Sequence, residues 1–307
     1  MVTTRFAPSP TGLLHLGHAY SARYACEAAW RRGGRCLLRI EDIDHTRCRS
    51  EFAAALVTDL EFLGLRFDGP VRRQSEHLAD YEQALQQLGA LGVLYPCFCT
   101  RAAIAAEIAQ APSAPNAPSA DPQALGPRYP GRCRGLDPAE GQARIAGGQS
   151  YALRLHVDRA VALCRDRGPL TWHDEHAGRV TATPELLGDV VLARRELRTS
   201  YHLAVTIDDH LQGVTLVTRG EDLFHATHVH RLLQVLLGLR EPRYYHHNLV
   251  ADSSGQRLAK RNRAITLRHL RDCRRTPDDI WRMIGLPGAS HPAAEPHAPG
   301  EPHARAS

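Results

Sequence analysis

Residues 3–18 read TTRFAPSPTGLLHLGH, and this opening stretch determines the expected fold. Residues 3–7 have the composition of a short strand, and the Pro/Gly turn after them leads into an amphipathic helix over residues 16–31. The helix closes at Gly33-Gly34, and residues 36–40 form a second apolar strand that ends in an acidic run. Strand, turn, helix and strand in this order predict a right-handed parallel unit.

The same alternation continues along the chain. Residues 50–63 and 76–91 have helical patterns, and the runs 189–192, 202–207, 214–218 and 223–239 extend the alternation. The predicted fold class is therefore α/β, a doubly wound parallel sheet, with ligands bound beyond the carboxyl ends of its strands. Two segments fall outside this pattern: residues 111–127 are predicted to be a loop, and residues 287–307 a disordered tail.

Composition narrows the class of protein. The chain has 307 residues, 43% of them hydrophobic, a net charge of +5 and a pI near 8.9. This length predicts one large domain with an inserted lobe, and the Arg-rich charge suits phosphate or nucleic acid, although a GC-biased composition would give the same excess. The eight cysteines do not have the spacing of a secreted disulfide framework, and neither a signal sequence nor a membrane span is apparent. We therefore expect a cytoplasmic protein.

The His15-Leu16-Gly17-His18 motif is the first chemical signature. Two imidazoles and free backbone amides at the start of a helix can bind a triphosphate and stabilise charge at an α-phosphate under attack. Gly17 allows a nucleotide to approach the backbone. The alternative is that both histidines only cap or pack, which the preceding Pro/Gly turn makes the weaker interpretation.

Arg257-Leu258-Ala259-Lys260-Arg261 is the second signature. Lys260, with Arg257 beside it, can neutralise a leaving pyrophosphate. A basic loop alone is usually a solvated turn. Together with His15 and His18, however, it predicts ATP-dependent activation of an amino acid, whereas a small-molecule nucleotidyltransferase would share only the histidine motif.

Five blocks in sequence order resemble class I aminoacyl-tRNA synthetases of the glutamyl type: RFAPSPTG at 5–12, RIEDIDHTR at 39–47, YHLAV at 201–205, GVT at 213–215 and TRGEDL at 218–223. The resemblance implies a Rossmann-like catalytic core. It also implies glutamate binding by Arg5, Ala7, Ser9, Glu41, Tyr201 and Arg219. A structural ion pair between Glu41 and Arg219 is the alternative. Ala259 departs from the family's Lys-Met/Leu-Ser-Lys-Ser pattern by lacking a hydroxyl group, which predicts weaker loop closure.

Cys97, Cys99 and Cys133, with Tyr129, form a further constellation. Cys97 and Cys99 are too close along an extended chain for an easy disulfide, but both can face one metal, and Cys133 adds a third thiolate. Resemblance to the queuosine-directed subfamily of these synthetases implies a structural zinc ion with Tyr129 as fourth ligand. The alternative is a set of reduced, buried cysteines.

The expected domain organisation follows from these features. Residues 1–95 and 151–240 are expected to form the two halves of the catalytic domain. Residues 96–150 are expected to form an inserted zinc-binding lobe that contacts the acceptor. Residues 241–286 are expected to form a short helical or loop segment with the Lys260 signature, including a short helix over residues 277–284. The little chain after that signature leads us to expect no anticodon-reading domain of the kind that follows it in ordinary glutamyl synthetases.

The subfamily resemblance implies a specific reaction. L-Glutamate is activated with ATP and Mg²⁺, without tRNA, and is then passed to the queuosine base in the anticodon of tRNA(Asp). No residue suggests a dedicated general base for the transfer. The alternatives are a synthetase that charges a tRNA 3′ end, a small-molecule nucleotidyltransferase, and a non-catalytic zinc module that binds RNA.

Overall fold

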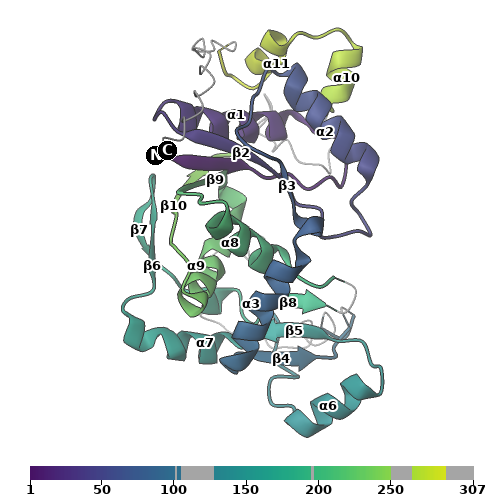
Figure 1. Cartoon of the computed structure of the whole chain (residues 1–307), viewed down its shortest axis with the longest axis vertical. Coiled ribbons are helices and arrows are strands. Elements are labelled where there is room, and N and C mark those ends of the chain that lie inside the picture. Colours follow the sequence, from purple (N-terminus) through teal and green to yellow (C-terminus); the bar gives the residue numbers. More distant parts are fainter. Residues whose placement is uncertain (101, 105–127, 195–196, 250–264, 288–307) are drawn as a thin grey trace, which may run out of the picture.

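The computed structural model describes residues 1–100, 102–104, 128–194, 197–249 and 265–287. Its amino-terminal part is the predicted parallel unit. Three parallel strands, in the order β1-β2-β3, alternate with helices α1 and α2 (Figure 1). The bounds are β1 Thr3–Phe6, α1 Leu16–Trp30, β2 Arg35–Ile40, α2 Ser50–Phe62 and β3 Arg72–Arg73.

Two adjacent glycines after α1 explain how the chain turns back into β2. Gly33 has a φ of 60°, a left-handed conformation that favours glycine. Gly34 lies so close to the Val2 carbonyl that a Cβ atom there would overlap it. Arg35 N then donates to Val2 O at 2.8 Å, which sets the register of β2 against β1.

A second group of strands, in the order β7-β6-β10-β9, extends the parallel sheet. β6 and β9 each pair in parallel with β10, whereas β7 forms an antiparallel hairpin with β6. β9 lies beside β1, where Thr215 N donates to Thr3 O at 2.9 Å and Thr3 N donates to Thr215 Oγ1 at 2.9 Å. The α/β class with a parallel sheet is therefore confirmed. The bounds are β6 Thr171–Asp174, β7 Gly178–Thr181, α8 Tyr201–Leu211, β9 Leu216–Gly220, α9 Ala226–Leu237 and β10 Arg243–His247.

A separate antiparallel sheet, β4-β5-β8, lies at the end of the molecule away from β1, with α6 beyond it (Figure 1). We predicted that residues 189–192 continue the parallel alternation, and this is wrong, because β8 pairs antiparallel with β5. An apolar run specifies burial but not the strand beside it. The bounds are α3 Leu78–Ala90, β4 Leu94–Cys97, α6 Pro138–Ala146, β5 Ala152–Leu155, α7 Val157–Cys164 and β8 Val191–Arg194.

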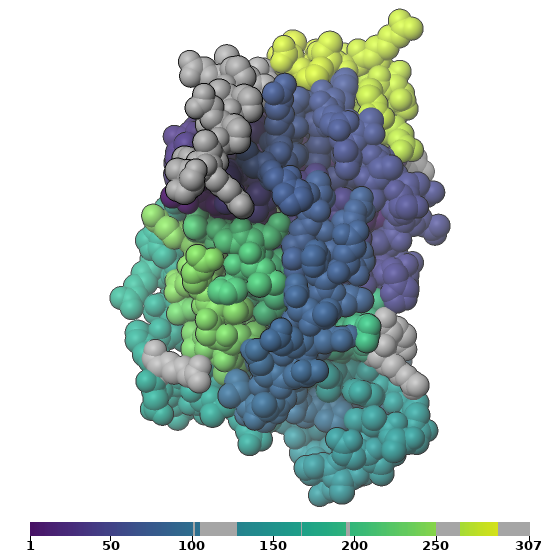
Figure 2. Space-filling view, viewed as in Figure 1, coloured from purple at the N-terminus to yellow at the C-terminus, as the bar shows by residue number. Residues whose placement is uncertain are grey.

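Helices α2 and α3 lie along one face of the molecule and join its two ends, as the blue band in Figure 2 shows. Two short helices, α10 (Leu267–Asp272) and α11 (Pro277–Met283), pack through Leu270, Ile280 and Trp281 into the core beneath α1 and α2. The predicted short helix near residue 277 is therefore confirmed. The 3₁₀ turns are Gln74–Glu76, Arg165–Arg167, Pro184–Leu186 and Glu221–Leu223.

Among the described helices, none has both the length and the apolar character that crossing a membrane requires. The predicted loop 111–127 and nearly all of the predicted tail 287–307 lie outside the described residues.

Candidate active site

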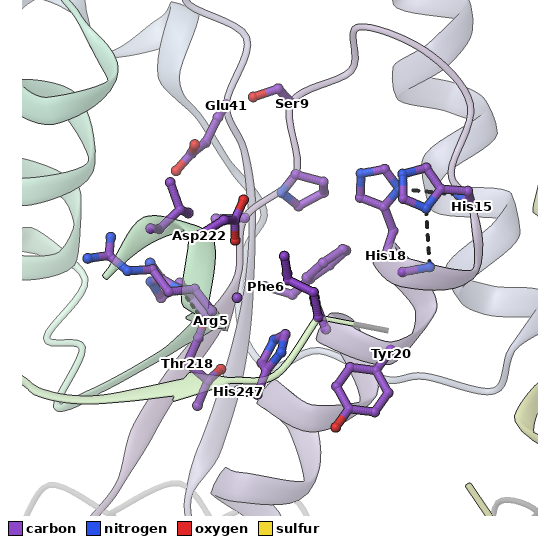
Figure 3. Close-up of a pocket in the computed structure, with 18 of the residues that line it drawn as sticks. Arg5, Phe6, Ser9, His15, His18, Tyr20, Glu41, Thr218, Asp222 and His247 are labelled. Atoms are coloured by element: carbon purple, nitrogen blue, oxygen red, sulfur yellow. Dashed lines mark hydrogen bonds between the residues drawn. The ribbon is translucent and has the colours of Figure 1, made fainter. Parts of the chain in front are cut away.

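A cavity of about 590 Å³ lies at the carboxyl ends of β1, β2, β9 and β10, where the fold class predicts a ligand. In Figure 3, His15 and His18 are on one side of this cavity, and Arg5 and Glu41 are on the other. Nine residues predicted from the sequence line it together: Arg5, Ala7, Ser9, His15, Gly17, His18, Glu41, Tyr201 and Arg219. Parts of the chain more than 200 residues apart thus meet in one site.

His15 and His18 both cap helix α1. His15 Nδ1 accepts a hydrogen bond from Gly17 N, and His18 Nδ1 accepts one from His15 N, each at 3.2 Å. The alternative that the pair caps the helix is thus observed, but it does not exclude a chemical role. Because Nδ1 is the acceptor in each ring, a neutral imidazole there carries its hydrogen on Nε2. Two Nε2–H groups at a helix N-terminus suit a phosphate.

Arg5 and Glu41 are both buried and are held by charged neighbours. Arg5 Nε donates to Asp209 Oδ1 at 2.9 Å, and Arg5 Nη1 donates to Thr218 O at 3.1 Å. Arg39 Nη2 lies 3.3 Å from Glu41 Oε1, and Arg39 Nη1 donates to Asp209 Oδ1 at 2.8 Å. Burial raises the pKa of Glu41, while Arg39 and Arg5 act in the opposite direction.

Arg219 is a buried cation that has only neutral partners among the described residues. Its guanidinium donates to His246 Nε2 at 3.1 Å, Tyr201 Oη at 3.2 Å, His230 Nδ1 at 3.3 Å and Thr227 Oγ1 at 2.5 Å. The alternative of a Glu41–Arg219 ion pair is not observed, because Glu41 pairs with Arg39. A buried positive charge without a carboxylate is costly, which makes this site suited to an anionic ligand.

The histidines around Arg219 are neutral. Burial and the positive charge of Arg219 lower the pKa of His246 to about 4, although Asp174 raises it. The same two causes, burial first, place the pKa of His230 well below its ordinary value. Asp174 Oδ2 lies 2.7 Å from His246 Nδ1, so Nδ1 carries the hydrogen and Nε2 is the acceptor for Arg219.

Arg257, Ala259 and Lys260 of the second signature lie outside the described residues. The described residues on either side of this segment are at the cavity. Leu249 lines it, and Thr266 forms an isolated antiparallel bridge with His15.

Cys97, Cys99 and Cys133 come together near β4, with all three sulfur atoms within 4.8 Å of one another. Tyr129 Oη lies 3.4 Å from Cys97 Sγ and 3.5 Å from Cys99 Sγ, and the Sγ atoms of Cys99 and Cys133 are 3.5 Å apart. The backbone N–H of Cys133 donates to Tyr129 Oη at 2.9 Å. The four predicted ligands therefore converge on one point that can hold a metal ion.

Comparison with known proteins identifies the family. The family described as tRNA synthetases class I (E and Q), catalytic domain, matches residues 1–297. The chain belongs to this family of class I synthetases. The glutamyl-Q tRNA(Asp) synthetase of Rhodobacter capsulatus is 49% identical over 291 residues, which cover 92% of this chain and 99% of that protein. The namesake in Symbiobacterium thermophilum is 39% identical, covering 98% of this chain and 91% of that one.

Other class I synthetases match over a smaller share of their own length. The glutamate–tRNA ligase of Coprothermobacter proteolyticus is 35% identical over 94% of this chain and 59% of the ligase. The crystal structure of a glutamate tRNA ligase from Elizabethkingia meningosepticum, in complex with its amino acid, has a TM-score of 0.68 and 28% identity, covering 85% of this chain. This chain spans about half the length of that solved protein, 52%.

A second cavity of about 930 Å³ adjoins the first in this class I synthetase. The two share Ser9, Glu41 and Tyr201. The second cavity extends past His202 to Tyr129 of the cysteine cluster and to Arg154, whose guanidinium carbon lies 3.8 Å above the Tyr129 ring. It therefore connects the Glu41 and Tyr201 end of the first cavity to the candidate metal site.

Sequence reasoning missed several buried groups that this class I synthetase uses to position the predicted ones. Arg39 and Asp209 hold Glu41 and Arg5, and His230 and His246 hold Arg219. Arg39 lies in the RIEDIDHTR block, within the apolar run of residues 36–40. A charged residue in a strand that is expected to be buried could have indicated that Arg39 has a charged partner. The two histidines, in α9 and β10, have no spacing that distinguishes them from ordinary core histidines.

Proposed function

We propose that this protein activates L-glutamate with ATP, without tRNA, and transfers the glutamate to the queuosine base in the anticodon of tRNA(Asp). The observation that carries the first step is the buried, uncompensated charge of Arg219 in the same cavity as His15 and His18. The name of the Rhodobacter capsulatus relative, which this chain covers almost completely, supports the acceptor.

Glutamate fits the end of the first cavity formed by Arg5, Glu41 and Arg219. Its side-chain carboxylate would accept from the remaining N–H of Arg219, on Nη2, where it would supply the missing counter-charge. Tyr201 Oη, which accepts from Arg219 Nη1, lies beside it and can donate its own hydrogen. Glu41 would bind the ammonium group. The remaining predicted contacts, the backbone at Ala7 and the hydroxyl of Ser9, line the cavity beside them.

Activation would take place toward the histidine end. An oxygen of the glutamate α-carboxylate attacks the α-phosphorus of ATP, a new P–O bond forms, and the bond to pyrophosphate breaks. His15 and His18 donate Nε2–H groups to the phosphate oxygens, Gly17 allows close approach, and Arg257 and Lys260 neutralise the leaving pyrophosphate. Mg²⁺ bound with ATP would supply further neutralisation of the phosphate charge.

Transfer would then consume the mixed anhydride. A hydroxyl oxygen of the queuosine cyclopentene diol attacks the acyl carbon, an ester bond forms, and AMP leaves with the electrons of the acyl–oxygen bond. The hydroxyl proton passes to a phosphate oxygen of the adenylate. The second cavity adjoins the glutamate end and offers the acceptor a path to it.

We also infer that the cysteine cluster holds one structural Zn²⁺. A tetrahedral zinc ion with bonds of about 2.3 Å to sulfur and about 2.0 Å to oxygen has S···S edges of about 3.8 Å and S···O edges of about 3.5 Å. Three of the six edges, Cys97–Tyr129, Cys99–Tyr129 and Cys99–Cys133, are 3.4 to 3.5 Å, and all three sulfur atoms lie within 4.8 Å of one another. Cys97, Cys99, Tyr129 and Cys133 would be the ligands, in the predicted inserted lobe of residues 96–150. We also propose a cytoplasmic location, because the proposed acceptor is a tRNA.

One specific observation favours a second candidate. Relatives named glutamate–tRNA ligase are 32 to 35% identical to this chain, so charging of a tRNA 3′ end is the alternative. The two candidates share the activation step and differ in the hydroxyl group that accepts glutamate.

Glutamate-dependent exchange of labelled pyrophosphate into ATP, measured without tRNA, tests the activation step. We expect exchange with glutamate and none with aspartate, because the shorter side chain cannot reach Arg219 while its α-carboxylate reacts. Absence of exchange with glutamate would refute the proposed activation.

A further inference from the structure

His202 is a residue of the second cavity that neither reaction step has yet used. It follows Tyr201 at the start of α8, it is half-buried, and it lines the second cavity. Its Nδ1 lies 3.2 Å from Nε2 of His230, which is fully buried behind it. With Nδ1 turned to the interior, Nε2 is the polar atom that this ring can offer to the cavity.

Arg219 determines which nitrogen of His202 carries the hydrogen. An arginine donates hydrogen bonds and accepts none, so His230 Nδ1, 3.3 Å from Arg219 Nη1, must be the acceptor. The hydrogen of neutral His230 is therefore on Nε2, which donates to His202 Nδ1. Neutral His202 in turn carries its hydrogen on Nε2. The fixed charge of Arg219 thus sets the polarity of a hydrogen-bond chain that ends at the second cavity.

The protonation state of His202 is consistent with this assignment of its hydrogen. Burial, and then the positive charge of Arg219, lowers the pKa of His202 to about 4. The ring is neutral near pH 7 and presents Nε2 as a donor, not as a base. The reverse tautomer would direct the Nδ1–H of His230 at the N–H of Arg219, which is repulsive.

We propose that His202 is a specificity-determining residue, whose Nε2–H binds an oxygen of the acceptor nucleoside in the second cavity. This inference rests on the proposed function. The oxygen that fits is the second hydroxyl of a vicinal diol, next to the hydroxyl that attacks. A donor placed on the attacking oxygen would withdraw the electron pair that forms the ester, whereas a donor on its neighbour orients the diol and leaves that pair available.

The hydrogen bonds from Arg219 through His230 to His202 also link the two proposed substrates. The Arg219 guanidinium that would bind the glutamate side chain is the group that fixes the donor of His202, two hydrogen bonds away. Correct placement of Arg219 therefore serves both glutamate recognition and acceptor recognition.

The test separates adenylate formation from transfer in single-turnover reactions of the full chain. Glutamyl-adenylate is first formed from ATP and labelled glutamate. One portion is trapped with hydroxylamine, a small nucleophile that needs no orientation by His202, and the other is mixed with queuosine-containing tRNA(Asp). The variants are His202→Leu, which removes the donor, and His202→Gln, whose amide N–H₂ can replace it. His210→Leu, the same change at the other end of α8, is the matched control.

We expect His202→Leu to form trapped hydroxamate at nearly the wild-type rate, and to transfer glutamate to tRNA about tenfold to a hundredfold more slowly, the effect of one lost directional hydrogen bond. His202→Gln should recover most of the lost rate, and His210→Leu should behave as wild type. Wild-type transfer by His202→Leu would overturn the assignment. So would a His202→Gln variant no faster than His202→Leu, or a parallel loss of hydroxamate. Failure of the wild type to transfer while hydroxamate forms would instead refute the proposed acceptor.

Discussion

At the scale of single residues, the site combines side chains that stabilise the fold and that we also propose take part in the chemistry. His15 and His18 cap α1 through Nδ1 and line the cavity. Arg219 is buried with four neutral acceptors around it and no carboxylate among the described residues. These double roles can be separated, because substitutions exist that preserve one of them.

His15→Asn separates the helix cap from the chemistry. Asparagine is among the best N-cap residues, so this variant should keep the melting temperature nearly unchanged, whereas His15→Ala should lose about 1 kcal/mol of stability. Both variants lack the Nε2–H donor, and both should slow pyrophosphate exchange about tenfold to a hundredfold. Thermal unfolding and exchange kinetics check this prediction. Full exchange activity in His15→Asn would assign His15 to the helix cap alone.

Arg219→Gln tests the site for the glutamate side chain. Loss of a buried, charged hydrogen-bond donor costs about 3 kcal/mol, so kcat/KM for glutamate in the exchange reaction should fall about 150-fold. The KM for ATP should stay nearly constant, because the phosphates are expected at the histidine end. Arg31→Gln, an exposed arginine at the end of α1, is the control. If Arg219→Gln lowered kcat/KM for ATP as much as kcat/KM for glutamate, the assignment of Arg219 to the glutamate side chain would be contradicted.

At the scale of elements, the amino-terminal alternation was predictable and the pairing of β8 was not. The turn after β1 and the glycine pair after α1 are local signals, and the observed bounds of β1, α1 and β2 differ from the predicted ones by about one residue. β8 was predictable as a strand, but its partner β5 lies more than 30 residues earlier in the chain, and no local pattern specifies a pairing at that separation. In the site, the motif residues were predictable, whereas Asp209 and His246 depend on contacts between distant segments.

The segments around β4 that form the cysteine cluster should lose their metal ion, and with it stability, when one ligand is removed. Cys133→Ser should lower zinc from about one ion per chain to nearly none, as measured by elemental analysis, and should lower the melting temperature. Transfer to tRNA should fall more than pyrophosphate exchange, because Tyr129 lines the second cavity and not the first. Cys273→Ser, at an exposed cysteine, is the matched control. Unchanged zinc content in Cys133→Ser would remove this residue from the ligand set.

At the scale of the whole molecule, histidines with lowered pKa values predict acid sensitivity. Burial comes first among the causes that lower the pKa of His202, His228 and His246 to about 4. In the unfolded chain these groups have a pKa near 6.5, so below that pH the unfolded state binds protons that the folded state does not. The free energy of unfolding therefore has its full value above about pH 6.5. It decreases as the pH falls toward 4, by at most about 1.4 kcal/mol per pH unit for each histidine.

Urea unfolding at pH 7 and pH 5 measures this effect. The free energy of unfolding of the wild type should decrease over this interval, and His228→Asn, which removes one such group away from the proposed substrates, should decrease less. His269→Gln, at an exposed histidine of α10, should follow the wild type. If the free energy of unfolding decreased equally between pH 7 and pH 5 in His228→Asn and in the wild type, His228 would not be held neutral by the fold.

The whole molecule also brings the two proposed steps together. One cavity is lined by the residues that we propose bind glutamate and phosphate, and the adjoining cavity leads toward the cysteine cluster. The account depends on where the activated glutamate goes. Its most direct test is transfer of labelled glutamate to tRNA(Asp) whose 3′-terminal adenosine has been removed, followed by nuclease digestion to locate the label. We predict label in the anticodon fragment of queuosine-containing tRNA, and none in tRNA without queuosine. Label that requires the terminal adenosine would contradict the account.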